Sequence, residues 1–417
     1  GGLARQSRIA ASLAVAAFFA GNVMRAEAIP ANLFSEAELE PLAWSELQGW
    51  AEEDHQAALR TFRTSCKVLA RGKRSQHAGS LVDAALRKIC RRAPKPGSTG
   101  RSARAFFETN FRPFRISKLG EAQGFLTGYY EPVIEGSRTA DGEYAVPLYR
   151  RPSDLVALDA PRKLDPFPNK GRVGRAIGKG RIADYFDRAA IEDGALKGRG
   201  LEICYLKDPI EAFFAQIQGS ARVRLKQGGV LRITYDAHNG HPYTPVGRIL
   251  IERKIVPKEE MSMDRIRQWM LANPDEAREV RRQNRSYVFF RVTGLGKNEE
   301  PVGAQGAPLT AGRSIAIDKA LHAYGTPFWI EAELPIGPDG ASSPFRRLMI
   351  AQDTGSAIVG PARADLYFGA GEKAGRLAGS IRHAGRFVVL IPHRLDPART
   401  RVPLPRPRPD ASQARSR

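Results

Sequence analysis

Residues 348–371 read LMIAQDTGSAIVGPARADLYFGAG, and this stretch decides the fold. The apolar run at 348–352 predicts a buried strand that ends at Asp353. A glycine-rich loop follows, and a second acid, Asp365, stands directly before a Leu-Tyr-Phe run. Burial disfavours the charged form of a carboxyl group, so we expect a raised pKa at Asp365 and a role as a proton donor. The alternative is an aspartate that only caps a turn or a helix.

The composition is that of a turn-rich, strongly basic protein, whose charge demands a partner or a location. A chain of 417 residues is long enough for two or three domains. Its 40 glycines and 29 prolines favour β structure with many turns over long helices. The net charge of +21 indicates an anionic polymer, such as cell wall or a lipid surface, as partner.

The first 28 residues predict a secretory signal peptide. Arg5 and Arg8 precede an apolar run at 9–20, and Ala-Glu-Ala at 26–28 fits a cleavage site. The run is too short to span a bilayer comfortably, and no cysteine follows it for a lipid anchor. We therefore expect a periplasmic protein, with peripheral association with the anionic wall or outer membrane left open. Secretion excludes nucleic acid as the partner.

Three cysteines remain for an oxidising compartment. Cys66 and Cys90 lie on neighbouring predicted helices, so they are candidates for a disulfide. Cys204 is then left over as a small buried thiol, and the spacing of the three fits no metal site. We expect neither a metal nor a cofactor.

Periodicity divides the chain into helical and strand-rich parts. The segment from 35 to about 112 is helical in pattern and begins with Ser-Glu-Ala-Glu, which resembles an N-cap with early acids. The last third predicts strands only, and 394–417, with seven arginines and a Pro/Arg-rich run, predicts a disordered tail. We expect helices at 59–69, 81–89, 103–111, 182–193 and from 209, 262 and 274, and strands at 125–132, 144–149, 201–206, 223–225, 230–235, 287–290, 314–317, 328–332, 348–352 and 387–391.

The strand at 125–132 ends in a cluster suited to sugar. Paired aromatic rings can stack on pyranose faces, while hydroxyl and carboxylate groups bind their rims. The alternative is that the tyrosines only fill a β core. The end of the helix beginning at 209 adds amide and hydroxyl groups of the same kind. The candidate sugar-binding residues are Thr127, Gly128, Tyr129, Tyr130, Glu131, Gln216, Gln218 and Ser220.

Three aspartates stand at or near predicted strand ends: Asp318, Asp353 and Asp365. The Asp-Thr-Gly at 353–355 resembles the active-site turn of an aspartic protease. Such enzymes need two aspartates that share a proton, and no second Asp-Thr/Ser-Gly occurs in the chain. A protease is therefore the weaker hypothesis.

Several spaced motifs together resemble the MltA family of lytic murein transglycosylases, with their C-terminal 3D domain. The resemblance covers about 124–391. The motifs are TGYYEP at 127–132, PLYR at 147–150, QIQGS at 216–220, VGR at 246–248, MSM at 261–263, SYVFF at 286–290, ID at 317–318, DTG at 353–355 and ADLY at 364–367. The chain departs from well-known members in having no lipobox cysteine, which puts outer-membrane tethering in doubt.

The resemblance implies an α+β, mainly β fold with two domains beside a groove. A double-psi β-barrel with N-terminal helices would comprise 29–132 and 297–393. A smaller β-barrel domain at 133–296 would be inserted between these parts. We expect a monomer.

The resemblance also implies a reaction and its acid. The family's catalytic aspartate falls on Asp365, and Asp318 and Asp353 take the places of two supporting acids. Glycoside hydrolysis uses two carboxyl groups, whereas a transglycosylase closes a 1,6-anhydro ring with the sugar's own C6 hydroxyl. One acid can then serve first as acid and afterwards as base. The expected substrate is the peptidoglycan bond between N-acetylmuramic acid and N-acetylglucosamine. A non-catalytic protein that only binds peptidoglycan is the alternative.

Overall fold

The computed structural model describes residues 36–72, 80–158 and 173–397 of the chain. The predicted signal peptide and nearly all of the predicted tail therefore lie outside the described residues. Within those residues, no helix combines the length and the apolar character that a membrane span requires.

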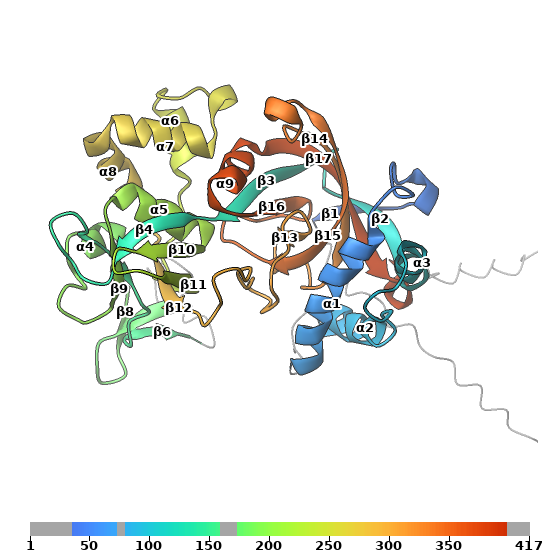
Figure 1. Cartoon of the computed structure of the whole chain (residues 1–417), viewed down its shortest axis with the longest axis horizontal. Coiled ribbons are helices and arrows are strands. Elements are labelled where there is room, and N and C mark those ends of the chain that lie inside the picture. Colours follow the sequence, from blue (N-terminus) through green and yellow to red (C-terminus); the bar gives the residue numbers. More distant parts are fainter. Residues whose placement is uncertain (1–35, 73–79, 159–172, 398–417) are drawn as a thin grey trace, which may run out of the picture.

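Six strands close into a barrel built from both ends of the chain, as predicted (Figure 1). Closure occurs because β3 pairs in parallel with β16 and also antiparallel with β17. Two further strands, β1 and β2, extend the sheet from β17. The bounds are β1 Ala37–Pro41, β2 Phe111–Lys118, β3 Gly124–Glu131, β13 Ser314–Ala316, β14 Pro327–Leu334, β15 Ser343–Asp353, β16 Arg363–Ala370 and β17 Arg382–Pro392.

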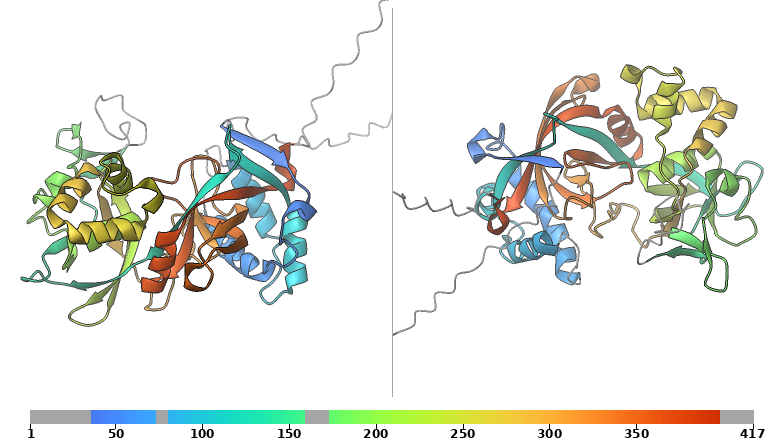
Figure 2. Two further views of the ribbon diagram at one scale, coloured as in Figure 1. Left: turned by 90° about the horizontal axis from the view of Figure 1, so that it is seen from above. Right: turned by 180° about the vertical axis from the view of Figure 1, so that it is seen from behind.

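Three N-terminal helices cover the barrel on the side away from the rest of the molecule (Figures 1 and 2). They are α1 His55–Arg71, α2 Ser80–Cys90 and α3 Gly100–Asn110, as the apolar periodicity predicted. Gln352 of β15 donates to the backbone oxygen of Thr61 and to the Ser65 hydroxyl, which ties α1 to the barrel. The expected disulfide joins Cys66 of α1 to Cys90 of α2, and Cys204 is buried and free.

The helix expected from residue 35 is wrong. The chain instead forms β1, in which Ala37 pairs with Lys118 and Pro41 pairs with Phe114 of β2. The Ser-Glu-Ala-Glu pattern indicates a helix only locally. A ready edge strand offers backbone hydrogen bonds that override it.

The middle of the chain forms a second sheet of six strands, ordered β12-β11-β10-β4-β9-β5. A single bridge between Arg150 and Phe290 joins its two edges. Strand β4 directly follows β3, so the chain passes from the barrel to this sheet at Pro132 (Figure 1). The strands are β4 Val133–Ser137, β5 Val146–Tyr149, β9 Glu202–Leu206, β10 Ser220–Leu225, β11 Val230–His238 and β12 Val288–Val292, and a small separate sheet contains β6 Leu155–Ala157, β7 Val173–Ala176 and β8 Ile182–Ala183.

Helices accompany the second sheet and form their own apolar core. Pro209 begins one of them at N1 and Ser262 caps another, both as predicted. The helix expected at 182–193 is shorter, because 182–183 joins the small sheet and Asp187 caps a helix that starts only at Arg188. The helices are α4 Arg188–Glu192, α5 Pro209–Gln218, α6 Val246–Glu252, α7 Met263–Ala272 and α8 Pro274–Gln283, and short 3₁₀ turns lie at Trp44–Glu46, Lys258–Glu260, Pro338–Gly340 and His393–Leu395.

The last third is not all β, since helix α9 spans Gly371–Ser380 between β16 and β17. This helix lies directly on β3. A Cβ on Gly128 would stand 2.7 Å from the Cα of Ala378, so only glycine allows this approach. Gly128 therefore has a packing role beside α9.

Candidate active site

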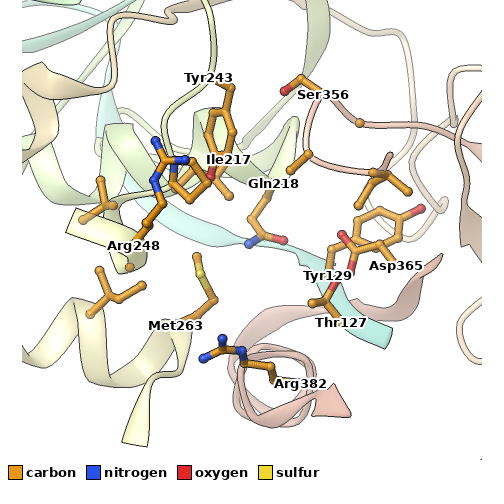
Figure 3. Close-up of a pocket in the computed structure, with 18 of the residues that line it drawn as sticks. Thr127, Tyr129, Ile217, Gln218, Tyr243, Arg248, Met263, Ser356, Asp365 and Arg382 are labelled. Carbon is orange, nitrogen blue, oxygen red and sulfur yellow. Dashed lines mark hydrogen bonds between the residues drawn. The ribbon is translucent and has the colours of Figure 1, made fainter. Parts of the chain in front are cut away.

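A cavity of about 790 Å³ lies between the barrel and the helices of the second sheet. Its barrel wall comes from β3, from β16 and from the loop after β15. Its other wall comes from the end of α5 and from segments around 243–248 and 261–263 (Figure 3). The motifs that are scattered along the sequence therefore meet around one space.

Asp365 lines this cavity from the middle of β16. It pairs with Ala316 on one side and with Thr127 on the other. The Thr127 hydroxyl donates to Oδ1 of Asp365 at 2.8 Å, and Figure 3 shows the two side chains together. Burial raises the pKa of Asp365 to about 6, against the lowering effects of Arg363 and Thr127. A carboxyl group with such a pKa can hold a proton and release it near neutral pH.

Asp353 also lines the cavity, but both of its carboxylate oxygens accept hydrogen bonds from the protein. Oδ2 accepts from the Tyr129 hydroxyl at 2.9 Å, and Oδ1 accepts from the backbone amides of Ala304 and Thr354, both at 2.9 Å. Burial raises the pKa of Asp353, while these three donors oppose the shift. The contacts suit a carboxylate that holds Tyr129 and the following loop in place.

Asp318 does not line the cavity. Its Oδ1 accepts from the amide of Ala320 and its Oδ2 from the amide of Gly360, at 2.9 and 2.8 Å. Asp318 therefore fixes the far end of the loop that begins at Asp353. Its role as a supporting acid stays a prediction.

Two predicted amides line the opposite wall. Gln218 accepts a hydrogen bond from the backbone amide of Tyr130 at 3.1 Å, so it links this wall to β3. Gln216 accepts from Nη2 of Arg188 at 2.8 Å. Arg188 is buried and also donates to the backbone oxygens of Asn284 and Ser286. Gln216 is thus a support for the wall more than an exposed amide.

Three predicted sugar ligands lie elsewhere. Glu131 is 1% exposed and bonded to Arg222 and Arg232, so its carboxylate is unavailable to a sugar. Ser220 is buried at the start of β10 and does not line the cavity. The Tyr130 ring faces Gly375 of α9, because neighbouring residues of a strand point to opposite sides. Thr127, Gly128 and Tyr129 do line the cavity.

Several residues that line the cavity were not predicted from the sequence. Arg363 stands two residues before Asp365 on the same strand, and the period of two places both side chains on one face. That spacing is a signal that could have found it. Arg188 and Tyr243 also line the opposite wall. The partners of Arg188 are remote in sequence, so no local pattern indicates this arginine. Within the described ranges, no cluster of three His, Cys, Asp or Glu side chains could hold a metal ion.

Two family models match the chain. The MltA specific insert domain matches residues 125–291, and the 3D domain matches residues 313–391. The first match begins within β3 and covers the second sheet. The second match covers β13 to β16 and most of β17.

Curated relatives and solved structures agree with these matches. Membrane-bound lytic murein transglycosylase A of Escherichia coli K12 is 33% identical over 300 residues, which is 71% of this chain and 73% of the relative. The structure of a membrane-bound lytic murein transglycosylase from Agrobacterium tumefaciens is 39% identical, with a TM-score of 0.75 over 85% of this chain and 98% of that one. A crystal structure of E. coli MltA with bound chitohexaose is 28% identical, with a TM-score of 0.58 over 85% and 91% of the two chains.

Proposed function

Since the chain belongs to the family of membrane-bound lytic murein transglycosylase A, we propose that it is a lytic transglycosylase of peptidoglycan glycan strands. The bond cleaved is the β-1,4 linkage between N-acetylmuramic acid and N-acetylglucosamine. One observation carries the assignment of the acid: Asp365 lines the cavity with its pKa raised to about 6.

The proposed reaction uses Asp365 twice. Protonated Asp365 gives its proton to the glycosidic oxygen, and the bond from C1 to that oxygen breaks. The C6 hydroxyl oxygen of the same muramoyl residue then bonds to C1, and its proton passes to the Asp365 carboxylate. The product carries a 1,6-anhydro ring, no water is consumed, and the acid is restored. The nucleophile is already attached to the reacting sugar, so little entropy is lost in bringing it to C1.

The hydrogen bonds that Asp353 accepts support a reaction with a single catalytic acid. Hydrolysis would need a second carboxylate to activate water or to attack C1. Asp353 instead accepts three hydrogen bonds from the protein. An aspartic protease is disfavoured as well, because it needs a second Asp-Thr/Ser-Gly turn and the sequence has only the one at 353–355. A protein that only binds glycan would have no need of a carboxyl group with a raised pKa in its cavity.

We further propose the domain division 29–132 with 297–393 around an inserted 133–296, and a periplasmic, monomeric protein. The closed barrel and the separate six-stranded sheet support the division. Secretion rests on the signal-like sequence at 1–28.

Basic side chains around the cavity support contact with an anionic wall polymer. Of the charged residues that line it, the basic ones are Arg188, Arg248, Lys258, Arg363 and Arg382, against Glu252, Asp353 and Asp365. Arg382 at the start of β17 donates to the backbone oxygen of Lys258 at 3.1 Å, so these two lining residues adjoin each other.

We expect the double change Lys258→Gln and Arg382→Gln to weaken binding to purified sacculi several-fold at low salt. The loss should shrink at high salt, because screening already removes the attraction between exposed charges. Co-sedimentation at two ionic strengths measures this, with Arg253→Gln as a control. Arg253 pairs with Glu279 and does not line the cavity. Equal binding by the double variant and the native protein at low salt would refute the role of these cations.

The function is tested by the mass of the soluble products released from sacculi. A transglycosylase product is lighter by one water than the corresponding product of a lysozyme-type hydrolase. We expect the lighter mass for the native protein. The heavier mass would exclude the proposed reaction, and an absence of soluble products would favour a protein that only binds glycan.

A further inference from the structure

Asp365 is the end of a short chain of hydrogen bonds that begins at a guanidinium group. Nη2 of Arg363 donates to Oγ1 of Thr127 at 2.8 Å, and that hydroxyl donates to Oδ1 of Asp365 at 2.8 Å. Arg363 is itself held in place. Its Nη1 donates to the backbone oxygen of Ala364, and its guanidinium lies over the Phe125 ring, 5.2 Å from the centroid.

The direction of these bonds is fixed by chemistry. A guanidinium group can only donate, so the Thr127 oxygen must accept from Arg363. The single hydroxyl proton of Thr127 is then directed to Oδ1 of Asp365. A proton on Oδ1 would compete with that bond and leave the threonine hydroxyl without its acceptor. Oδ2 has no hydrogen-bond partner among the described residues, nor is it one of their fully enclosed polar atoms.

We propose that Arg363 is a positioning residue that, through Thr127, keeps the transferable proton on Oδ2 of Asp365 and favours its release toward the cavity. The inference rests on the proposed function, in which Asp365 is the acid. Arg363 itself is given no contact with the reacting atoms.

The chain of hydrogen bonds from Arg363 through Thr127 stabilises Asp365 most strongly while the proton leaves it. A hydrogen bond to a charged carboxylate is roughly twice as strong as one to a neutral group. The bond from Thr127 therefore strengthens as Asp365 becomes negative, and the nearby positive charge of Arg363 adds to the effect. An interaction that grows along the reaction coordinate lowers the barrier, whereas one of constant strength does not.

The groups around Asp365 balance its proton affinity. Burial raises its pKa and the Asp353 carboxyl group adds to the rise, while Arg363 and Thr127 lower it. From the remaining elements the facing groups are the hydroxyls of Tyr129 and Tyr243, whose own pKa values are raised by burial and also by the charge of Asp365. The raising effects already dominate, and without Arg363 the pKa of Asp365 would rise further.

The first test is the pH profile of Arg363→Met. The enzyme needs protonated Asp365, so its kcat/KM falls as pH rises through the pKa of that group. Loss of the guanidinium should raise that pKa and move the basic limb upward by about one pH unit, with a lower maximal rate. Arg347→Met is the matched control, since Arg347 also lies over an aromatic ring, that of Phe345, and donates to a backbone oxygen away from the cavity. Its limb should not move.

A second pair of variants keeps the test decisive if Arg363→Met does not fold. Thr127→Val keeps the branched shape and removes the hydroxyl, and should also move the basic limb upward. Thr127→Ser keeps the hydroxyl and should retain the native limb. If the basic limb of the pH profile stays at its native position in folded Arg363→Met, or in Thr127→Val, the positioning role of Arg363 would be refuted. Failure of the proposed function looks different, because Asp365→Asn would then stay active.

Discussion

Asp365→Asn is expected to lower the release of soluble products from sacculi by about 100- to 10 000-fold, the range that general acid–base catalysis supplies. Asparagine has nearly the same size and keeps an oxygen that can accept from the Thr127 hydroxyl, as Oδ1 does now at 2.8 Å. It lacks the transferable proton. Neither protonation of the glycosidic oxygen nor the later removal of the C6 hydroxyl proton can then occur.

The fold should survive this change. Burial already disfavours the charged form of Asp365, as its raised pKa of about 6 shows, so a neutral amide removes a cost of folding at neutral pH. We expect the thermal unfolding temperature to be equal to or above that of the native chain. Asp339→Asn, on an exposed turn at Pro338–Gly340, is the matched control and should keep full activity. Native rates in Asp365→Asn would remove the assignment of the acid.

Glu131→Gln is expected to lower the free energy of unfolding by about 3–5 kcal/mol, as removal of one partner from a buried ion cluster does. Glu131 is 1% exposed and accepts from Nε of Arg222 at 2.6 Å and from Nη2 of Arg232 at 2.9 Å. Arg232 is 2% exposed. A neutral glutamine would leave these two guanidinium groups without their shared countercharge.

The cluster around Glu131 also joins the two connections between the barrel and the second sheet. Glu131 ends β3, directly before the chain passes into β4. On the returning connection, Arg232 donates to the backbone oxygen of Gly296 at 2.7 Å, and Arg222 donates to those of Lys297 and Glu299. Loss of Glu131 should therefore loosen both connections at once.

Urea unfolding measures this effect, with Glu279→Gln as the control. Glu279 pairs with Arg253, but both side chains are exposed, so solvent screens the pair and its loss should matter far less. Similar stability changes in Glu131→Gln and Glu279→Gln would contradict the role given to the buried cluster.

The sequence predicted the fold best where a local pattern and a tertiary contact agree. The apolar run before Asp353 is a barrel strand, and the spacing of Cys66 and Cys90 on neighbouring helices does yield a disulfide. The helix expected from residue 35, and helix α9, which the prediction missed, show the reverse case. There, β1 pairs with β2 and α9 packs closely on Gly128 of β3, and neither contact is visible in a local window.

The sequence likewise predicted some residues of the site correctly and others not. Asp365 was predicted as the acid and does line the cavity with a raised pKa. The strand period could have separated Tyr129, which faces the cavity, from Tyr130, which faces α9. No period could have excluded Glu131, because it shares a strand face with Thr127 and Tyr129. Its two arginines come from β10 and β11, about a hundred residues later.

The proposed reaction requires that the C6 hydroxyl, and not water, attacks C1 after Asp365 gives up its proton. The most direct measurement is digestion of sacculi in water enriched in heavy oxygen, followed by the mass of the muramoyl end of each product. We predict a 1,6-anhydro end without heavy oxygen for the native chain, and for Asp365→Asn a release of product lower by about 100- to 10 000-fold. One heavy oxygen fixed at C1 of the native product would exclude this reaction.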